Sequence, residues 1–448
     1  LTVNLSLMNN KDFLDAEMEI ADYQRRTDPN LQNVHYRCKL RYRGASALKY
    51  DKKSFAVKLF DENGEDLDAE IFGIRNENDW ILDAMAIDRI RMRNRVCFDL
   101  WNQMSRTPYE TNYEGRNGTK CEYVEVFVNG EYHGLYCMSD KIDRKLLNLK
   151  KIRTDGDEMI SVRGLLYKGT GWGSASDLLS YETADVNKEK WNIWELKYPD
   201  DYPSAETWQP LMDLIDFCSD KTGDDEFQRE WQNHFHEGNL VDYMVFTLAL
   251  NVRDNGYKNM YISTVNINKD QRFMITPWDM DASLGGNWNG AHLEGTSHLN
   301  RYNEIGPYNR LYVNDIDGFR DKLRDVWAQH RNTVFSQANV EKLLDGYAEL
   351  FMKSGAWQRE YERWNNNPVP LDESLYEELD YVKSWYRKNY IHLDKALGTP
   401  TGIRPVKKRD TSETGSLYSV DGRKIAQSNT HQLPKGIYIM DGKTIAIR

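Results

Sequence analysis

The sequence has few cysteines, and their spacing excludes two kinds of small stabilised domain. The five cysteines are scattered without a C-x-x-C pair, which argues against a zinc ribbon and gives no disulfide framework. They are Cys38, Cys97, Cys121, Cys137 and Cys218. We therefore expect buried free thiols.

Long apolar runs and an excess of positive charge are also lacking. No segment approaches the ~18 consecutive apolar residues that a membrane helix requires, so we expect no membrane span. The formal net charge is −11 at pH 7, which argues against a general affinity for nucleic acid. An acidic protein can still bind ATP through a few local Lys and Arg side chains and a metal ion.

The sequence is long and rich in aromatic residues. Its 448 residues, of which 40% are hydrophobic and 29% charged, suffice for two or three ordinary domains or for one two-lobed enzyme. The 13 Trp and 27 Tyr residues would suit a carbohydrate-binding surface, but large cores and interfaces use the same residues.

Residues 1–140 are predicted to form a β-rich unit. Residues 35–42 and Ser54–Phe60 alternate apolar and polar side chains as strands do, and Asn129-Gly130 between two such runs indicates a β-hairpin. One helix is expected in this unit, from about Asp88 to Met104, because its apolar residues repeat at helical spacing.

Residues 141–398 are predicted to be mainly helical. The apolar segment Asn239–Leu250 favours a helix capped by Asn239. Further helical patterns cover residues 318–329, 339–354 and 373–397. The expected fold class is therefore α+β.

The end of the chain has a different composition. Residues 399–415 are rich in Pro, Thr, Lys and Ser and are expected to be a linker. Residues 416–448 contain short strand-like runs with turns at Asp421-Gly422 and Asp441-Gly442. So few residues cannot easily bury a core of their own, so we expect a small β-rich appendage.

The most informative stretch links a D-x-x-x-x-N loop, Asp254 to Asn259, with Asp279 one hairpin later. Phosphoryl transfer with a divalent metal needs a carboxylate to orient the attacking hydroxyl, and a carboxamide and a second carboxylate to hold the metal against the phosphates. Protein kinases supply these groups in the same chain order. Asp-Asn-Gly is also a common turn, so the loop alone does not decide between catalysis and a turn.

The order of several dispersed motifs resembles the CotH kinase family, the atypical kinases similar to spore coat protein H. The resemblance covers roughly residues 35 to 395. The segments that carry it are Arg43–Ser46, Lys52–Lys58, Arg93-Asn94, Val128–Tyr136, Leu166–Lys168, Trp194–Pro199, Asp254–Asn259 and Pro277–Asp281.

This resemblance implies an atypical kinase-like fold with two lobes that binds ATP and phosphorylates proteins with Mg²⁺ or Mn²⁺. Asp254 would orient the acceptor hydroxyl as the base, and Asn259 and Asp279 would hold the metal. Asp281 would be either a second metal ligand or a loop cap.

The resemblance also implies nucleotide contacts from the first 140 residues. Lys58 would meet the phosphates, although a solvated strand lysine is the alternative. The turn from Arg43 to Ser46 would cover the phosphates, but it lacks the repeated glycines of a phosphate-binding loop. Asp140 would lie near the hinge, or else be a solvated loop residue. No acidic partner for Lys58 is evident on the following helix.

The last residues resemble a second family. Residues 417–424 and 433–439 are similar to the C-terminal sorting domain of the Por (type IX) secretion system of Bacteroidetes. This resemblance implies export across the outer membrane, and so a secreted or surface-attached protein. A plain β-hairpin extension is the alternative.

Three functions are therefore open. The first is a secreted protein kinase that acts on Ser or Thr of an unidentified protein. The second is a catalytically silent kinase-like protein that binds at the cell surface, for example an adhesin. The third is a carbohydrate-active hydrolase, but its two carboxylates must lie ~5 to ~9 Å apart across a sugar, and Asp279 and Asp281 are too local in sequence for that.

Overall fold

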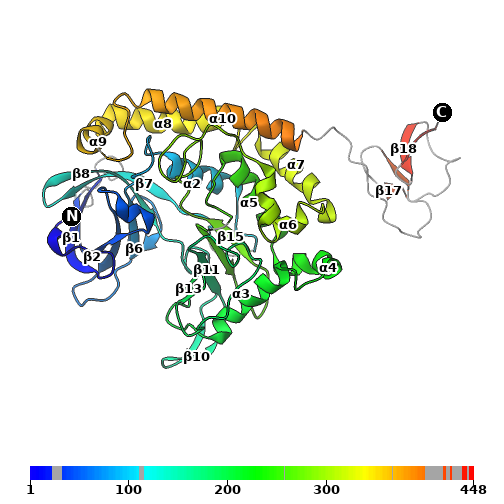
Figure 1. Cartoon of the computed structure of the whole chain (residues 1–448), viewed down its shortest axis with the longest axis horizontal. Helices are drawn as coiled ribbons and strands as arrows, with labels where there is room; N and C mark the ends of the chain where they lie inside the picture. The colour runs from blue at the N-terminus through cyan, green and yellow to red at the C-terminus, as the bar shows by residue number, and fades with distance from the viewer. Residues whose placement is uncertain are drawn as a thin grey trace. The chain divides into compact units, whose positions relative to one another are not determined.

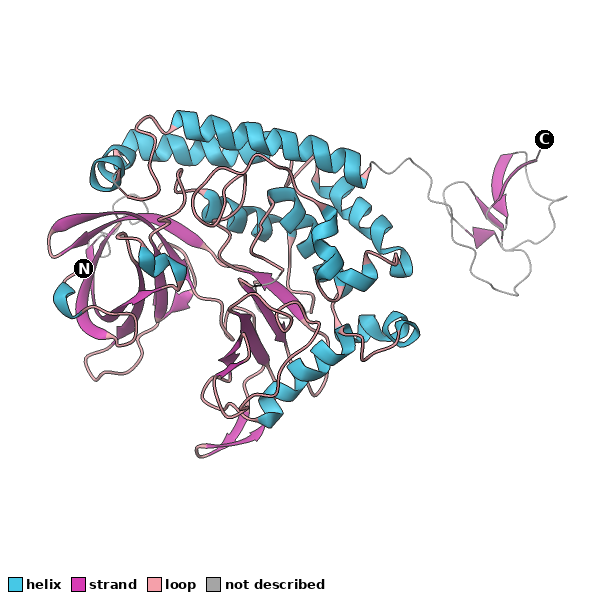
Figure 2. Ribbon diagram, viewed as in Figure 1, coloured by secondary structure: helices cyan, strands magenta, loops and turns pink. Residues whose placement is uncertain are grey.

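The computed structural model describes residues 1–22, 33–109, 116–256, 258–365 and 367–398, and four strands beyond them. Contacts between residues divide the chain into two compact units, Leu1–Gly398 and Thr399–Arg448. Both helices and strands are abundant in the first unit (Figures 1 and 2), so the fold class is α+β as predicted.

The first unit begins with a six-stranded antiparallel sheet in the order β1-β2-β3-β6-β8-β7. The strands are β1 (Leu14–Ala21), β2 (Asn33–Arg43), β3 (Ser54–Phe60), β6 (Asp79–Asp83), β7 (Cys121–Val128) and β8 (Glu131–Asp140). The sheet curls around its own hydrophobic core (Figure 1). The predicted alternation of β3 is confirmed, because Phe55, Val57 and Leu59 are fully buried in that core.

The predicted hairpin between β7 and β8 is also confirmed. Asn129 and Gly130 have φ values of 53° and 86°, the left-handed backbone that a two-residue hairpin turn of the right twist requires.

Helix α2 (Arg93–Met104) follows β6 and begins later than predicted. The Asp88 carboxylate accepts hydrogen bonds from the backbone N–H groups of Ile90, Met92 and Arg93, and Arg91 has a left-handed φ of 57°. These contacts fold residues 88–92 into a turn that precedes the helix.

A second, five-stranded antiparallel sheet has the order β12-β13-β11-β14-β15. Its strands are β11 (Leu165–Gly169), β12 (Lys190–Trp191), β13 (Trp194–Tyr198), β14 (Met260–Thr264) and β15 (Met274–Pro277). Two small hairpins flank the sheets, and their strands are β4 (Ala69–Glu70), β5 (Asn76–Glu77), β9 (Arg153–Asp155) and β10 (Glu158–Ser161).

The remaining α-helices lie between β13 and β14 or after β15 in the chain (Figure 2). They are α3 (Ala205–Cys218), α4 (Asp224–His234), α5 (Glu237–Leu250), α6 (Tyr308–Leu311), α7 (Phe319–His330), α8 (Gln337–Ser354), α9 (Ala356–Trp364) and α10 (Tyr376–Leu397). Helix α8 contacts α10, and α9 contacts β8 of the first sheet (Figure 1). Among the described residues, every helix is too short or too polar to cross a membrane.

The predicted cap of α5 is wrong. The helix begins at Glu237, and Asn239 is a buried residue inside it. Its side chain donates to the Ile275 carbonyl at 3.0 Å and accepts from the Ile275 N–H at 2.6 Å. Asn239 therefore ties α5 to β15 instead of ending the helix.

All five cysteines are buried free thiols, as predicted.

The second unit contains a four-stranded sheet in the order β17-β16-β18-β19. Its strands are β16 (Leu417–Ser419), β17 (Lys424–Ile425), β18 (Gly436–Met440) and β19 (Lys443–Ile447). The predicted linker and the two predicted Asp-Gly turns lie outside the described residues.

Candidate active site

The β14–β15 hairpin places two of the predicted metal-binding residues side by side. Asn259 precedes β14 and Asp279 follows β15, so both lie at the open end of the hairpin. The Trp278 N–H donates to the Asn259 carbonyl at 3.0 Å. Asn259 and Asp279 have left-handed φ values of 55° and 56°, a conformation that Asn and Asp adopt more readily than most residues.

The loop that carries Asp254 is held in place by Arg301. This guanidinium donates hydrogen bonds to three backbone carbonyls of the loop, those of Val252, Arg253 and Asn255, at 2.9, 3.2 and 2.7 Å. Asn255 is fully buried, and its side chain donates to the Trp278 carbonyl at 3.0 Å. The loop is therefore fixed to the residue that precedes Asp279.

Asp254 is buried and close to the other predicted acids. Lys258 lies one turn later, with its Nζ 3.0 Å from Asp254 Oδ2. The Arg253 N–H, next to Asp254, donates to the Ala282 carbonyl, next to Asp281, at 3.2 Å. The structure thus brings together Asp254, Asp279 and Asp281.

Burial and mutual repulsion raise the pKa of the two later acids. The pKa of Asp279 is raised first by burial and then by the nearby Asp83 carboxylate, while Lys168 and Arg43 act in the opposite direction. The pKa of Asp281 is raised well above its ordinary value by burial and then by Asp279 and Asp83. Such a cluster favours the binding of a positive charge between the carboxylates.

Asp83 was not identified from the sequence. It is the last residue of β6, and Asn94 on α2 donates to its Oδ2 at 3.0 Å. The same Asn94 side chain accepts from the Met280 N–H at 3.1 Å. Asn94 belongs to one of the segments that carry the family resemblance, but no role was predicted for it.

Two basic side chains approach the acids, and only one of them was predicted. Arg43, at the end of β2, has its guanidinium 5.6 Å from the centroid of the Trp278 ring. Lys168, on β11, was missed as a functional residue. Burial and the Arg43 charge lower its pKa to about 8, although Asp279 raises it.

The turn after Arg43 is the segment that was predicted to cover the phosphates. Ser46 is exposed and begins the short 3-10 helix Ser46–Lys49. Tyr50 follows, and its pKa is raised by burial and by the charge of Asp281. Gly44 has a φ of +114°, which favours glycine at this bend.

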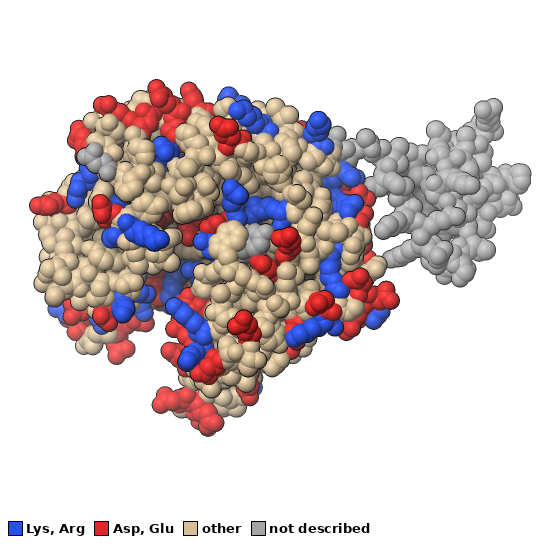
Figure 3. All heavy atoms as spheres, viewed as in Figure 1, with Lys and Arg blue, Asp and Glu red and all other residues tan. Residues whose placement is uncertain are grey.

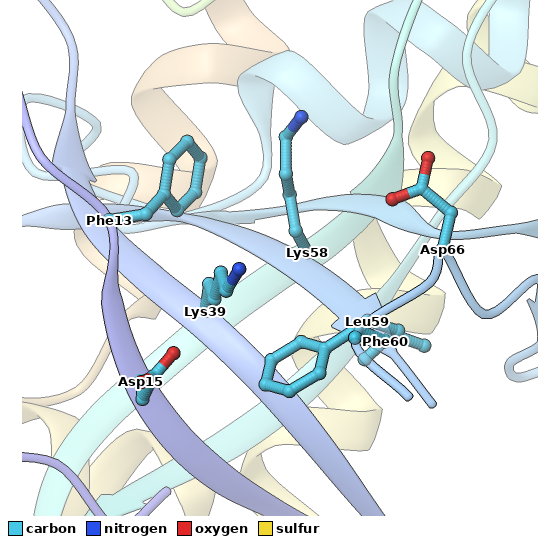
Figure 4. A pocket seen from close by; sticks show the side chains of 8 residues that line it. Phe13, Asp15, Lys39, Lys58, Leu59, Phe60 and Asp66 are labelled. Carbon is cyan, nitrogen blue, oxygen red and sulfur yellow. The ribbon is translucent and has the colours of Figure 1, made fainter. Parts of the chain in front are cut away.

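Lys58 has other neighbours than the acidic cluster. Its Nζ lies 3.8 Å from Asp79 Oδ1 and 5.6 Å from the centroid of the Phe13 ring. It lines a hollow of about 480 Å³ with Phe13, Asp15, Lys39, Leu59, Phe60, Gly64 and Asp66 (Figure 4).

The topology explains why Lys58 is set apart. Arg43 pairs with Ser54 on β3, so Lys58 lies four residues further along the strand, or about 13 Å at ~3.3 Å per residue. The strand directly before α2 is β6, not β3. The lysine whose charge acts on Asp279 is Lys168.

Asp140 is not a solvated loop residue. It ends β8, is fully buried, and accepts hydrogen bonds from Arg75, Arg116 and the Lys120 N–H at 3.3, 2.5 and 3.0 Å. Burial raises its pKa, and the two arginines lower it. Its contacts are those of a structural anchor at the end of the first sheet.

The donor set can be tested against a divalent metal. Within the described part of the chain, no three or more His, Cys, Asp or Glu side chains are arranged to hold a metal ion. Mg²⁺, however, usually takes one or two protein ligands plus water and substrate phosphates. Asn259 and Asp279 fit such an ion, which would arrive with a nucleotide.

The visible face of the molecule is mixed in charge (Figure 3). Figure 3 shows Lys and Arg intermixed with Asp and Glu on the visible face, and a notch between the curled first sheet and the part that carries β10 and β13. Basic and acidic side chains lie along this notch.

Comparison with known families gives a clear result. The family model described as CotH kinase protein matches residues 40–393. A search of curated proteins found no match. The matched range includes the whole acidic site and most of both sheets. The chain therefore belongs to the CotH kinase protein family.

Proposed function

We propose that this chain is a secreted protein kinase that transfers the γ-phosphoryl group of ATP to Ser or Thr hydroxyls of a protein. The observation that carries the proposal is that the Asp254 loop is bonded to the residue before Asp279, through Asn255 and the Trp278 carbonyl, at the hairpin end beside Asn259. A base, a carboxamide and a carboxylate in this arrangement are the groups that metal-assisted phosphoryl transfer requires.

The curled first sheet and the helical remainder would act as two lobes, with the nucleotide between them. Asn259 and Asp279 would hold Mg²⁺ or Mn²⁺, which would neutralise charge on the phosphates. Lys168 and Arg43 would contact phosphate oxygens, since both act electrostatically on Asp279. Lys258, 3.0 Å from Asp254, would face the phosphoryl group in transfer and stabilise its charge.

The reaction would follow from this placement. The acceptor hydroxyl oxygen attacks the γ-phosphorus, its proton passes to Asp254, and the bond from the γ-phosphorus to the bridging oxygen breaks to release ADP. Asp281, whose pKa is raised by burial and by the charges of Asp279 and Asp83, would support the metal-binding turn or the ion itself.

Calorimetry with ATP, in the presence and absence of Mg²⁺ or Mn²⁺, tests the proposal. Asp279→Asn should abolish metal-dependent binding, because a carboxamide cannot balance the charge of the metal. Asp254→Asn should keep nucleotide binding and lose transfer to protein, because the base acts on the acceptor.

The alternatives give different results. Wild-type protein that binds ATP with metal but labels no protein, itself included, would be a silent kinase-like protein of the cell surface, such as an adhesin. Protein that binds neither nucleotide nor metal would leave the carbohydrate-active hydrolase as the remaining alternative, and Asn259 has no role in that reaction.

Residues 416–448 support the proposal of export. Their four short strands fit a small sorting unit of the kind that the Por secretion system removes or attaches at the surface. Deletion of residues 416–448 should leave the protein inside the cell, as judged by fractionation. Export of the shortened protein at the normal level would contradict this role.

A further inference from the structure

The side chain of Asn94 joins two parts of the acidic site that are far apart in the sequence. It lies in the first turn of α2 and is half-buried. Its Nδ2 donates to Asp83 Oδ2 at 3.0 Å, and its Oδ1 accepts from the Met280 N–H at 3.1 Å. One carboxamide thus connects β6 to the turn after β15.

The bond to Met280 acts on both neighbouring acids. Met280 stands between Asp279 and Asp281, and Asp279 has a left-handed φ of 56°. A hydrogen bond to the N–H of the central residue fixes the peptide that follows Asp279. It therefore fixes the direction in which the two carboxylates leave the turn.

The bond to Asp83 holds a carboxylate that its neighbours repel. The charge of Asp83 raises the pKa of both Asp279 and Asp281. Asp83 Oδ1 also accepts from the Met85 N–H at 3.1 Å. The Asn94 amide adds a donor on the other oxygen without adding a charge that would compete with a metal ion.

In protein kinases, a strand lysine and a glutamate of the following helix form an ion pair that must be in place for catalysis. Here the strand directly before the helix ends in Asp83, and the helix residue bonded to it is Asn94. Neither residue carries a positive charge, so this contact is not an ion pair. The Asn94 oxygen accepts from the Met280 N–H in the turn that carries the acids.

Two further bonds keep α2 against the same turn. The Arg93 guanidinium donates to the Ser283 carbonyl at 3.1 Å, and the Cys97 thiol lies 3.2 Å from Ser283 Oγ. These contacts fix the end of the turn. The Cys97 thiol also lies 3.9 Å from the Met280 carbonyl, whereas Asn94 bonds the Met280 N–H.

We propose that Asn94 is a positioning residue. By hydrogen bonding both the Met280 N–H and the Asp83 carboxylate, it orients Asp279 and Asp281 to bind the metal–nucleotide complex. This role rests on the proposed function. It predicts that the effect of Asn94 appears in metal-dependent nucleotide affinity, whether or not an acceptor protein is present.

The experiment compares Asn94→Ala with Asn102→Ala in the full chain. Asn102 is on the same helix, is half-buried, and donates to the Thr119 carbonyl at 2.8 Å, away from the acids. The readouts are calorimetric affinity for ATP with Mn²⁺, affinity for ATP without metal, and the thermal midpoint. Asn94→Ala should weaken the Mn²⁺-dependent affinity about tenfold or more, as expected for a side chain that orients a metal ligand. Asn102→Ala should leave it unchanged.

A swapped pair separates positioning from simple loss of fold. Asn94→Asp alone places two carboxylates against each other and should weaken Mn²⁺-dependent binding. The double variant Asp83→Asn with Asn94→Asp exchanges the two groups. The amide at position 83 can then donate to the carboxylate at position 94, and that carboxylate can accept from the Met280 N–H. It should recover most of the affinity.

The outcomes are distinct. Equal Mn²⁺-dependent affinity in wild type and Asn94→Ala, or a swapped pair no better than Asn94→Asp, would overturn the role of Asn94. Wild-type protein that binds no ATP with metal would instead overturn the proposed function on which the role rests.

Discussion

Lys52 and Glu360 form a fully buried ion pair, with Nζ 2.5 Å from Oε1, although 308 residues separate them in the chain. Glu360 on α9 also accepts from Arg91 Nε at 2.8 Å and from the Leu135 N–H at 2.7 Å. Burial alone would raise the pKa of Glu360, but Lys52 and Arg91 bring it below its ordinary value. The last helices are thereby joined to the first sheet.

Glu360→Gln should strongly destabilise the protein. The substitution removes the carboxylate that neutralises the buried charges of Lys52 and Arg91, and breaking a buried pair costs about 3–5 kcal/mol. Denaturant unfolding monitored by circular dichroism measures the loss. Glu362→Gln, on the exposed side of α9, is the control and should change the free energy of unfolding by less than about 0.5 kcal/mol. Similar values for the two variants would show that the buried pair contributes little.

Gly134 precedes Leu135 on β8 and lies against the same ion pair. A Cβ at Gly134 would lie 2.8 Å from Glu360 Oε2 and 2.8 Å from Trp364 Nε1, whereas at Gly130 it would meet nothing within 4 Å. Both glycines have positive φ, so Gly134→Ala and Gly130→Ala share the backbone strain. Gly134→Ala should therefore be the more destabilising by about 1–3 kcal/mol, the usual cost of overpacking. Equal thermal midpoints for the two variants would contradict the crowding.

The repulsion among the acids should make the effect of metal depend on pH. Unfolded Asp titrates near ~3.9, and burial with nearby carboxylates raises the pKa of Asp279 and Asp281 in the native protein. Between the unfolded and native pKa values the native state binds more protons. The contribution of these groups to stability is therefore present at low pH and falls as pH rises through that window.

Addition of Mg²⁺ and ATP should then raise the thermal midpoint more at about pH 7.5 than at about pH 5, because metal binding requires ionised carboxylates. Differential scanning fluorimetry at both pH values measures the two shifts. Asp281→Asn should reduce the difference between them. A larger shift at the lower pH would contradict the assignment of metal binding to this cluster.

Local signals were enough to predict much of the first sheet. The alternation of Ser54–Phe60 and the Asn129-Gly130 turn depend on neighbouring residues, so the sequence contains what decides them. The start of α2 is also decided locally, but Asp88 forms a turn before the helix and not its first residue. The start of α5 was wrongly predicted because Asn239 does not cap the helix: it bonds a strand residue 36 positions away.

The same distinction applies to the site. Asp254, Asn259 and Asp279 stand in one stretch with a recognisable spacing, so they could be proposed together. Asp83, Asn94 and Lys168 come from a strand, a helix and another sheet, and only the folded chain brings them to that stretch. Their one sequence signal was that Asn94 and Lys168 lie in segments that carry the family resemblance.

The choice of phosphate-binding lysine can be decided by two matched substitutions, Lys168→Met and Lys58→Met. Lys168 acts on Asp279, whereas Lys58 pairs with Asp79. A hydrogen bond to a charged group contributes about 1.5–3 kcal/mol, so Lys168→Met should weaken ATP binding about tenfold or more, and Lys58→Met should have little effect. Calorimetry at saturating Mg²⁺ measures both.

The pH dependence gives an independent check on Lys168. Burial and the charge of Arg43 lower its pKa to about 8, and the ammonium is charged only below its pKa. The ATP affinity of the wild type should therefore fall as pH rises past this value, and that of Lys168→Met should not. If Lys58→Met weakens binding and Lys168→Met does not, the original assignment of the phosphates to Lys58 is correct and the nucleotide lies further along β3 than the acidic cluster implies.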